Sequence, residues 1–294
     1  MTNMTNSISS LKKQKSSSTD KLKKAMEQLK NNGVVKDTRF WQPEVDKAGN
    51  GYAVFRFLDS PAVDGEEGMP YVRLWHHGFQ GPGGWYIENS LITINQSDPV
   101  QEYNTMLKNS GVDANKKLAS TQRLRLSYIS NIYMINDSSH PENNGKVFLY
   151  KYGKKIFTKI DELINPQFAD EESVNPFDFW DGANFKLKIR NVDGYRNYDK
   201  SEFEKPSPLF ADDAEIEKVW KSAYSLKQLL EPTNFKSYDQ LKARLDRVVG
   251  MKGSNSGQPM MDPAYPPGKP ATESPLDYAD NDADLEIFKK LANE

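Results

Sequence analysis

Basic and aromatic side chains are interleaved in three stretches of this sequence, and together they could bind a nucleic acid strand. The richest is KVFLYKYGKKIFTK at 146–159, with five lysines and four aromatic residues. GYRNY at 194–198 places two tyrosines around an arginine, and WY at 85–86 follows a Gly-rich turn. Cations contact phosphates and rings stack on unpaired bases, each stack contributing about 1–3 kcal/mol, so the mix predicts sequence-tolerant binding of a single strand. The alternative for any one of these tyrosines is packing in the core.

Charge is distributed unevenly along the chain, although the net charge is only -2 over 294 residues. Residues 1–36 carry eight lysines against two acids, a net of +6, and residues 273–294 carry seven acids against two lysines, a net of -5. Residues 116–159 hold nine Lys and Arg against two acids, with six aromatic residues. One such run alone would indicate a solvated surface, but the three together predict a polyanionic ligand.

Residues suited to catalysis or metal binding are few. The chain has no cysteine and three histidines, so a disulfide framework and a thiolate metal site are both excluded. Asp178 and Asp181 could be the paired carboxylates of a nuclease, but a D-x-x-D near prolines more often caps a turn. His76 and His77 are adjacent and would point to opposite faces of a strand. No P-loop, GxGxxG, GxSxG or HExxH motif is present. The sequence therefore predicts a protein that is not an enzyme.

Short strands separated by turns are expected to position the aromatic and basic residues. Apolar alternation predicts strands at 52–58, 85–94, 122–135, 146–152 and 184–190, and helical spacing predicts helices at 101–109, 154–164, 212–230 and 238–249. In 184–190 three apolar residues alternate with three cations, so one face would be core and the other basic. Alternation places Tyr128 with Leu126 on an inner face. A capping box from Ser237 to Gln240 begins the last helix. These patterns predict a mainly β fold with helical additions.

Composition divides the chain into four parts. Residues 1–37 form a basic arm with a short helix, and 38–250 hold the folded core. Six prolines and three glycines among residues 251–275 predict a linker, assigned to 251–272, and the acidic tail at 273–294 follows. No apolar region near the N-terminus resembles a signal peptide, and no run is long enough to span a bilayer. We therefore expect a cytoplasmic protein with no membrane partner.

Five blocks of the sequence resemble, in the same order, the T-even-type bacteriophage single-stranded DNA-binding protein family, the helix-destabilising proteins of phage replication. They are WQPEVDKAGNGYAVFRFLDS at 41–60, HHGFQGPGGWYIE at 76–88, SYISNIYMI at 127–135, HPENNGKVFLYKYGKKIF at 140–157 and FWDGANFKLKIRNVDGYRNYDKSEF at 179–203. The similarity covers residues 38–250. Each block alone is modest, but five in this order are highly specific.

The resemblance implies an OB-fold barrel core with helical and small β extensions, and a cleft that follows the DNA backbone. In matching positions the cleft would be lined by Arg56, which contacts phosphate, and by the stacking residues Tyr86, Tyr128, Tyr150, Tyr195 and Tyr198. Arg123 and Arg125 fall in the family's basic strand, and the 146–159 stretch adds Lys151 and Lys154. The resemblance thus favours an exposed Tyr128, against the alternation of its strand.

The resemblance also gives roles to both arms. The family's N-terminal arm mediates cooperative binding through a Lys/Arg-Ser/Thr motif, which Lys13, Lys15, Ser16 and Ser17 resemble. Its acidic tail recruits replication and recombination proteins. The implied function is cooperative, sequence-nonspecific coating of single-stranded DNA in phage replication, recombination and repair, in the cytoplasm of the infected bacterial host. An RNA-binding translational regulator that uses the same cleft is the alternative.

One departure concerns a metal. Well-known members of the family hold a structural zinc with one histidine and three cysteines. His77 matches the histidine, but the segment from Asn89 to Gln101 contains no cysteine. We therefore expect no zinc and no other cofactor. Apolar packing of three residues, Leu91, Ile92 and Ile94, is expected to hold that region instead.

Overall fold

The computed structural model describes residues 37–251, except 169 and 193. The predicted cooperativity motif, Lys13, Lys15, Ser16 and Ser17, lies outside these residues, as do the acidic tail and nearly all of the arm and linker. From Arg39 onward the described residues belong to one compact unit. No helix among them is both long and apolar enough to cross a membrane.

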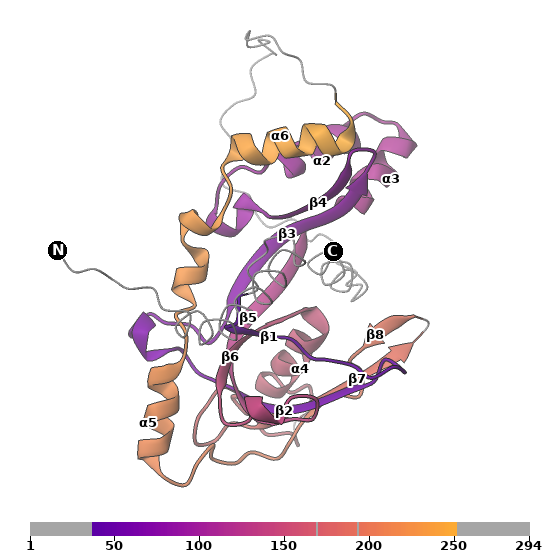
Figure 1. Cartoon of the computed structure of the whole chain (residues 1–294). Coiled ribbons are helices and arrows are strands. Elements are labelled where there is room, and N and C mark those ends of the chain that lie inside the picture. Colours follow the sequence, from indigo (N-terminus) through magenta and orange to yellow (C-terminus); the bar gives the residue numbers. More distant parts are fainter. Residues whose placement is uncertain (1–36, 169, 193, 252–294) are drawn as a thin grey trace, which may run out of the picture. The chain divides into compact units, whose positions relative to one another are not determined.

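Within the described residues the chain forms nine strands and five α-helices (Figure 1). The strands are β1 (Phe40–Trp41), β2 (Gly51–Phe57), β3 (Val72–Gly81), β4 (Gly84–Asn89), β5 (Arg125–Asp137), β6 (Val147–Tyr152), β7 (Asn184–Val192), β8 (Tyr195–Asn197) and β9 (Glu202–Phe203). The helices are α2 (Pro99–Asn109), α3 (Asp113–Thr121), α4 (Lys154–Ile164), α5 (Asp213–Ser222) and α6 (Tyr238–Val249).

Strand β5 is the centre of the sheet, because it pairs with three other strands. Its C-terminal half pairs antiparallel with β2, its N-terminal half pairs antiparallel with β3, and β6 runs antiparallel along its other edge. The sheet continues from β6 to a parallel β1 and from β2 to β7 and β8, while β4 pairs with β3 and β9 with β7. A register shift between Val54 and Phe55 marks a bulge, which bends and twists β2.

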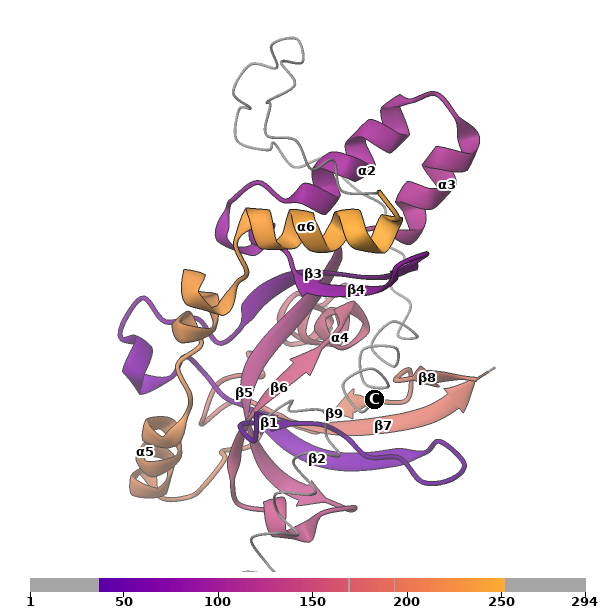
Figure 2. The same cartoon turned by 45° about the horizontal axis from the view of Figure 1, so that its top comes forward.

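Helices cover two different parts of this sheet. The β3–β4 hairpin carries α2 and α6 with α3 beside them, whereas α4 lies against the β5–β6 region near β7 and β8 (Figures 1 and 2). The hairpin approaches α6 very closely: a Cβ on Gly83 would lie 2.0 Å from the carbonyl oxygen of Arg247. Only glycine allows this contact, so the Gly-rich turn before residues 85–86 also holds α6 on the hairpin.

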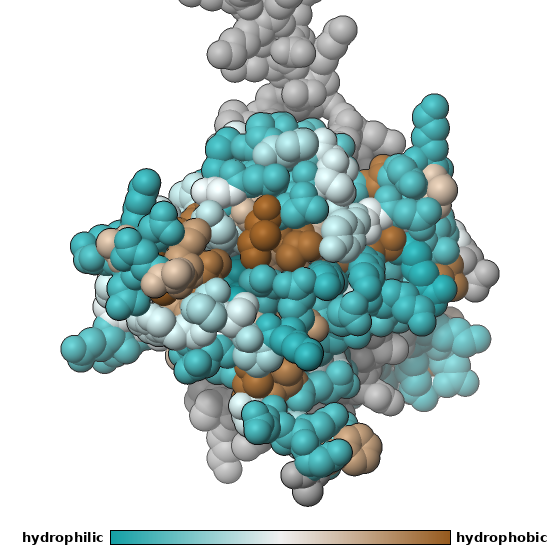
Figure 3. Space-filling model, turned by 90° about the horizontal axis from the view of Figure 1, so that it is seen from below, coloured by the Kyte–Doolittle hydropathy of each residue, from teal (hydrophilic) through white to brown (hydrophobic). Residues whose placement is uncertain are grey.

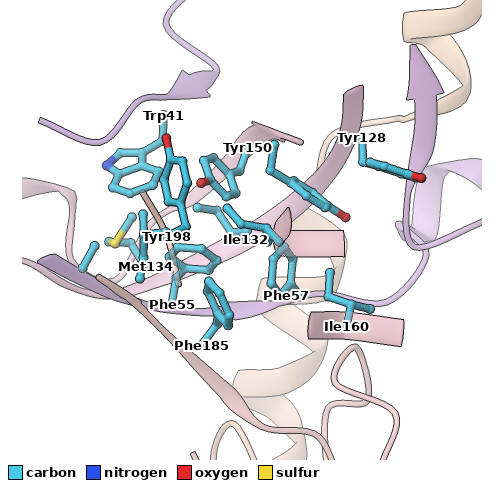
Figure 4. Close-up of a cluster of buried hydrophobic side chains, with 14 of the residues drawn as sticks. Trp41, Phe55, Phe57, Tyr128, Ile132, Met134, Tyr150, Ile160, Phe185 and Tyr198 are labelled. Carbon is cyan, nitrogen blue, oxygen red and sulfur yellow. The ribbon is translucent and has the colours of Figure 1, made fainter. Parts of the chain in front are cut away.

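The main core is unusually rich in aromatic side chains (Figure 4). Phe55, Phe57 and Phe185 are fully buried, and Ile156 and Ile160 reach into the same cluster from α4. Smaller clusters lie under α6 and beside α5. The surface seen from below is mostly hydrophilic, with separate hydrophobic patches (Figure 3). Burial of these rings is what fixes α4 against the sheet.

The mainly β fold with α additions is confirmed, but the described strands do not form a closed barrel. The path of paired strands begins at β1 and ends at β8, and these two strands do not pair with each other. Strand β3 lies off this path. Its first half pairs with β5, and its second half, from His76 to Gly81, pairs with β4 in a hairpin. The sheet that the structure describes is therefore open and mixed.

Most predicted elements are present, with two differences. Helix α4 matches its predicted range, and both bonds of the Ser237–Gln240 capping box are formed at α6. The long helix predicted at 212–230 is wrong, because α5 ends at Ser222 and a separate 3-10 turn follows at Lys227–Leu230. The strand predicted at 85–94 ends at Asn89, where Ser90 caps a 3-10 turn.

The alternation predicted for 184–190 is confirmed, but its cations are paired. Phe185, Leu187 and Ile189 are buried. On the other face Lys186 pairs with Glu204, Lys188 with Glu202 and Arg190 with Asp199. These three cations are matched by acids of the returning chain, so the basic face of β7 is largely neutralised.

Candidate nucleic-acid interface

One face of the β3–β5 pair combines aromatic rings with a cation that the sequence patterns above did not single out. Tyr71, Arg73 and Trp75 alternate along β3 and the residue before it, so they share a face. Arg73 is exposed and lies directly opposite Tyr128 on β5, and Trp75 lies opposite Leu126. The sequence contains a pattern that indicates this face: in YVRLW at 71–75, two apolar residues alternate with Tyr, Arg and Trp.

Tyr128 lies at the centre of a stack of rings on this face. Its ring is parallel to that of Phe157 on α4, with centroids 3.9 Å apart, and it also stacks with Tyr152 at 5.8 Å. Tyr71 meets both Tyr128 and Phe157 edge-on. Tyr128 is therefore only 7% exposed, as the alternation of its strand indicated. Its ring is buried against these neighbours, so it supports them rather than offering an open platform.

The other predicted tyrosines divide into buried and exposed. Tyr150 and Tyr198 belong to the main core, close to Trp41 (Figure 4). Tyr195 lies on β8 at the hairpin that follows β7 and is 54% exposed. Tyr195 is thus the most open of the predicted stacking residues.

The basic residues of β5 and β6 lie on the opposite face from the aromatic stack. Arg125 is the cross-strand partner of His76, and Lys151 is the partner of Ile129. Burial lowers the pKa of His76 well below its ordinary value, and the charges of Lys151 and Arg125 lower it further. Burial also lowers the pKa of Lys151 to about 8. These residues therefore form a positive cluster around a neutral histidine.

The interleaving of lysines and aromatics in the sequence thus becomes a separation in space. Successive residues of a strand point to opposite faces, so Lys151 and Tyr150 cannot share one. Cations reach the aromatic face from other elements. Lys154 is exposed in the first turn of α4, next to the Phe157–Tyr128 stack, and Arg73 comes from β3. Arg123 is half-buried just before β5 begins.

Arg56 requires a correction, because it does not face solvent. It is 0% exposed. Its Nε donates to the side-chain oxygen of Asn184 at 3.0 Å, Nη1 to the carbonyl of Asp178 at 3.1 Å and Nη2 to the carbonyl of Ser207 at 2.8 Å. Burial lowers its pKa to about 10, although Asp178 and Glu204 oppose that change. Arg56 therefore holds two loops against β2 through these hydrogen bonds. In this conformation it cannot contact a phosphate.

Tyr86 is also placed away from solvent. It is 1% exposed in the cluster beneath α6, where its ring stacks on Phe79 at 5.1 Å. Burial, with Asp98 and Glu88 nearby, raises the pKa of its hydroxyl. A base could not stack on Tyr86 unless α6 moved. In this structure the residue is therefore part of the core between the β3–β4 hairpin and α6.

A buried carboxylate occupies the region where the family resemblance implied zinc. Asp98 accepts hydrogen bonds from the Ser90 hydroxyl at 2.7 Å and from the amides of Leu91, Val100 and Gln101. The Nε2 atom of His77 lies 3.3 Å from the Asp98 carboxylate, and both side chains are 1% exposed. Burial alone would raise the pKa of Asp98, but His77 and the hydrogen bonds outweigh it and lower the pKa.

The geometry around His77 does not suit a metal ligand. Its Nδ1 faces the carbonyl of Gln122 at 3.0 Å, and its Nε2 faces Asp98. Both nitrogens therefore point at acceptors, whereas a metal ligand must present a lone pair. Within the described residues no group of three or more His, Cys, Asp or Glu side chains could hold a metal ion. Of the apolar residues expected to hold this region, Leu91 is buried and Ile94 packs against it, while Ile92 is only half-buried.

The Asp178–Asp181 pair forms a turn. One carboxylate oxygen of Asp178 accepts from the amides of Trp180 and Asp181, both at 2.7 Å. This oxygen is committed to shaping the backbone, as expected of a D-x-x-D turn.

Comparisons with known proteins identify the family of this chain. The family described as "gp32 DNA binding protein like" matches residues 49–249. The single-stranded DNA-binding proteins of Enterobacteria phages T2 and T4 are each 36% identical over 217 residues, covering 71% of this chain and 70% of theirs. The protein of the same name from Enterobacteria phage RB70 is 38% identical over 90 residues, covering 30% of this chain and 73% of its own. The chain therefore belongs to the gp32-like family of DNA-binding proteins.

Proposed function

We propose that this protein coats single-stranded DNA in the host cell during phage replication, recombination and repair. The observation that carries the proposal is the face of β3, β5 and α4, where the exposed Arg73 lies opposite Tyr128 among half-buried aromatic rings. A cation beside rings is what a sequence-tolerant single-strand binder requires. Membership of a DNA-binding family with single-stranded DNA-binding relatives supports it.

We assign the parts of the interface as follows. Trp75, Tyr71, Phe157 and Tyr195 offer partly exposed rings to the bases, and Tyr128 supports them from below. Tyr150 and Tyr198 hold the core beneath this layer. The cations that approach the phosphates on this face are Arg73, Arg123 and Lys154. Arg125 and Lys151, on the opposite face of β5 and β6, attract the strand at longer range through their charge. The open sheet would be an elaborated OB-type core, in which β3 is drawn away by its hairpin.

The segments outside the described residues have roles in this proposal. The basic arm at 1–37, with Lys13, Lys15, Ser16 and Ser17, mediates self-association along DNA. The Pro- and Gly-rich linker at 251–272 connects the core at 38–250 to the acidic tail. The tail at 273–294 binds replication and recombination proteins and competes with DNA for the cations. Its net charge of -5 supports the competition.

We further propose that the protein works without zinc and without catalysis, in the cytoplasm of the infected bacterium. The absence of cysteine from the whole sequence and the acceptor-facing nitrogens of His77 support the first point. The use of an Asp178 oxygen within a turn supports the second.

The test is a titration of the full-length protein with single-stranded homopolymer, duplex DNA and RNA across a salt series. Single-stranded DNA is expected to bind much more tightly than duplex, with steep salt dependence because each contacted phosphate releases counterion. Arg73→Gln should lower the slope of log K against log salt by about 0.7, the value per phosphate on a single strand. Lys218→Gln, an exposed cation on α5, is the matched control and should leave the slope unchanged. Equal affinity for duplex would overturn the proposal.

A further inference from the structure

An acidic groove lies between α4 and β9. It has a volume of about 720 Å³ and is bounded by the C-terminal half of α4, the loop that follows it and β9. Four carboxylates line it, from Glu162, Glu171, Glu172 and Glu202, against a single lysine, Lys159. We call this surface the acidic groove. A groove of this sign repels DNA, so it lies outside the interface described above.

The four carboxylates of the groove differ in whether a described cation pairs with them. Glu202 pairs with Lys188 of β7. Within the part of the chain that the structure describes, Glu162, Glu171 and Glu172 have no cationic partner and are exposed. These three carboxylates line one groove, so they offer a negative surface to a cationic ligand.

The floor of the groove is apolar. Leu163, Val174 and Phe203 line it, and Phe203 continues into the main core through contacts with Phe57 and Phe185. Phe168 stands at the rim and is 66% exposed. An exposed aromatic beside an apolar floor and an acidic rim fits a peptide that carries both an apolar anchor and lysines.

The chain itself contains one segment of that chemistry. LKKQKSS at 11–17 has one leucine followed by three lysines within four residues, in an arm of net charge +6. The tail at 273–294 is acidic and would be repelled. The arm of 36 residues spans on the order of 120 Å when extended, enough to reach an adjacent copy.

We propose that the acidic groove is the docking site for the basic arm of the neighbouring copy on DNA. The proposal rests on the proposed function, because coating places copies side by side. Leu11 enters the apolar floor, and Lys12, Lys13 and Lys15 meet the unpartnered carboxylates. The groove thereby becomes the core-side half of the contact that makes binding cooperative.

The experiment reverses the groove charge in the full-length protein. E171K/E172K changes two exposed side chains, so folding should be kept, which thermal unfolding checks. E66K/E67K makes the same charge change on an exposed loop before β3 and is the matched control. Two quantities are measured: cooperativity on long homopolymer, and affinity for an oligonucleotide that holds one copy.

The groove variant should lose about tenfold in cooperativity, equivalent to two surface ion pairs, while its oligonucleotide affinity stays equal to that of the control. Combining it with K12E/K13E should restore part of the loss, because the two charge patterns are then complementary again. Two results overturn the docking site. In the first, E171K/E172K binds with the same cooperativity as E66K/E67K. In the second, adding K12E/K13E to E171K/E172K lowers cooperativity further instead of restoring it. Failure of the unaltered protein to bind the oligonucleotide would instead overturn the proposed function.

Discussion

The most direct test of the packing around His77 is Asp98→Asn. Asp98 caps α2 and accepts four hydrogen bonds, from one hydroxyl and three backbone amides, beside His77. Asparagine has nearly the same shape but replaces one acceptor oxygen with a donor. The amide of Leu91, which bonds the same oxygen as Ser90, then faces either a donor or a lost partner.

The magnitude follows from those contacts. A buried donor left without an acceptor costs about 1–3 kcal/mol. The Ser90 hydroxyl also loses its charged acceptor, and hydrogen bonds to charged groups contribute about 1.5–3 kcal/mol. We therefore expect Asp98→Asn to lower the free energy of unfolding by about 3–5 kcal/mol, a large share of the roughly 5–15 kcal/mol typical of a domain.

Urea unfolding measured by tryptophan fluorescence and circular dichroism is the assay. Asp113→Asn is the matched control, because Asp113 also lies in the first turn of a helix but is 88% exposed and pairs only with Lys116. That substitution should change stability by less than about 0.5 kcal/mol. A metal chelator should leave the unfolding of the unaltered protein unchanged. Equal stability of the two variants, or a large loss with chelator, would refute the reasoning.

The pH dependence of stability provides a second test of Asp98. The pKa of Asp98 is lower in the folded protein than its ordinary value, so the unfolded chain binds the proton more readily. The stability that Asp98 contributes is therefore present above its ordinary pKa and is lost as the pH falls through the lower, folded value. Asp98→Asn should remove this part of the acid sensitivity.

Three further predictions concern the interface and its regulation. Arg56→Gln should lower the free energy of unfolding by about 3 kcal/mol or more, because the carbonyls of Asp178 and Ser207 lose a buried donor. The salt dependence of DNA binding should stay unchanged. A smaller salt slope in a folded variant would show instead that Arg56 contacts a phosphate. Lys151 has a pKa of about 8, so single-strand affinity should fall as the pH rises from 7 through about 8 to 9, and Lys151→Arg should flatten that fall in the same titrations. Deleting 273–294 should tighten binding at low salt, and unchanged affinity there would argue against competition by the tail.

Much of the fold follows from the sequence because its signals are local. The alternation of 184–190 needs only the two-residue repeat of a strand, and α6 needs only its capping box and apolar spacing. Charge segregation and ordered family blocks likewise depend on sequence alone. The predicted helix at 212–230 failed because its apolar spacing continued past Ser222, whereas the chain there turns to pack Leu226 against β3 and β5. That choice depends on a distant surface.

The site was decided by tertiary structure. Sequence named the types of residue that bind a single strand, but a tyrosine such as Tyr86 is a core residue or a platform according to what covers it, and α6 covers it. Arg56 carries the charge that a phosphate contact needs, but it is buried and donates its hydrogen bonds to Asn184 and to two backbone carbonyls far away in the chain. Arg73 gains its place beside Tyr128 only through the register of β3 on β5. Composition and spacing thus indicated a polyanionic ligand, while strand pairing and burial decided which of the chain's cations and rings are exposed, because exposure depends on contacts between distant segments.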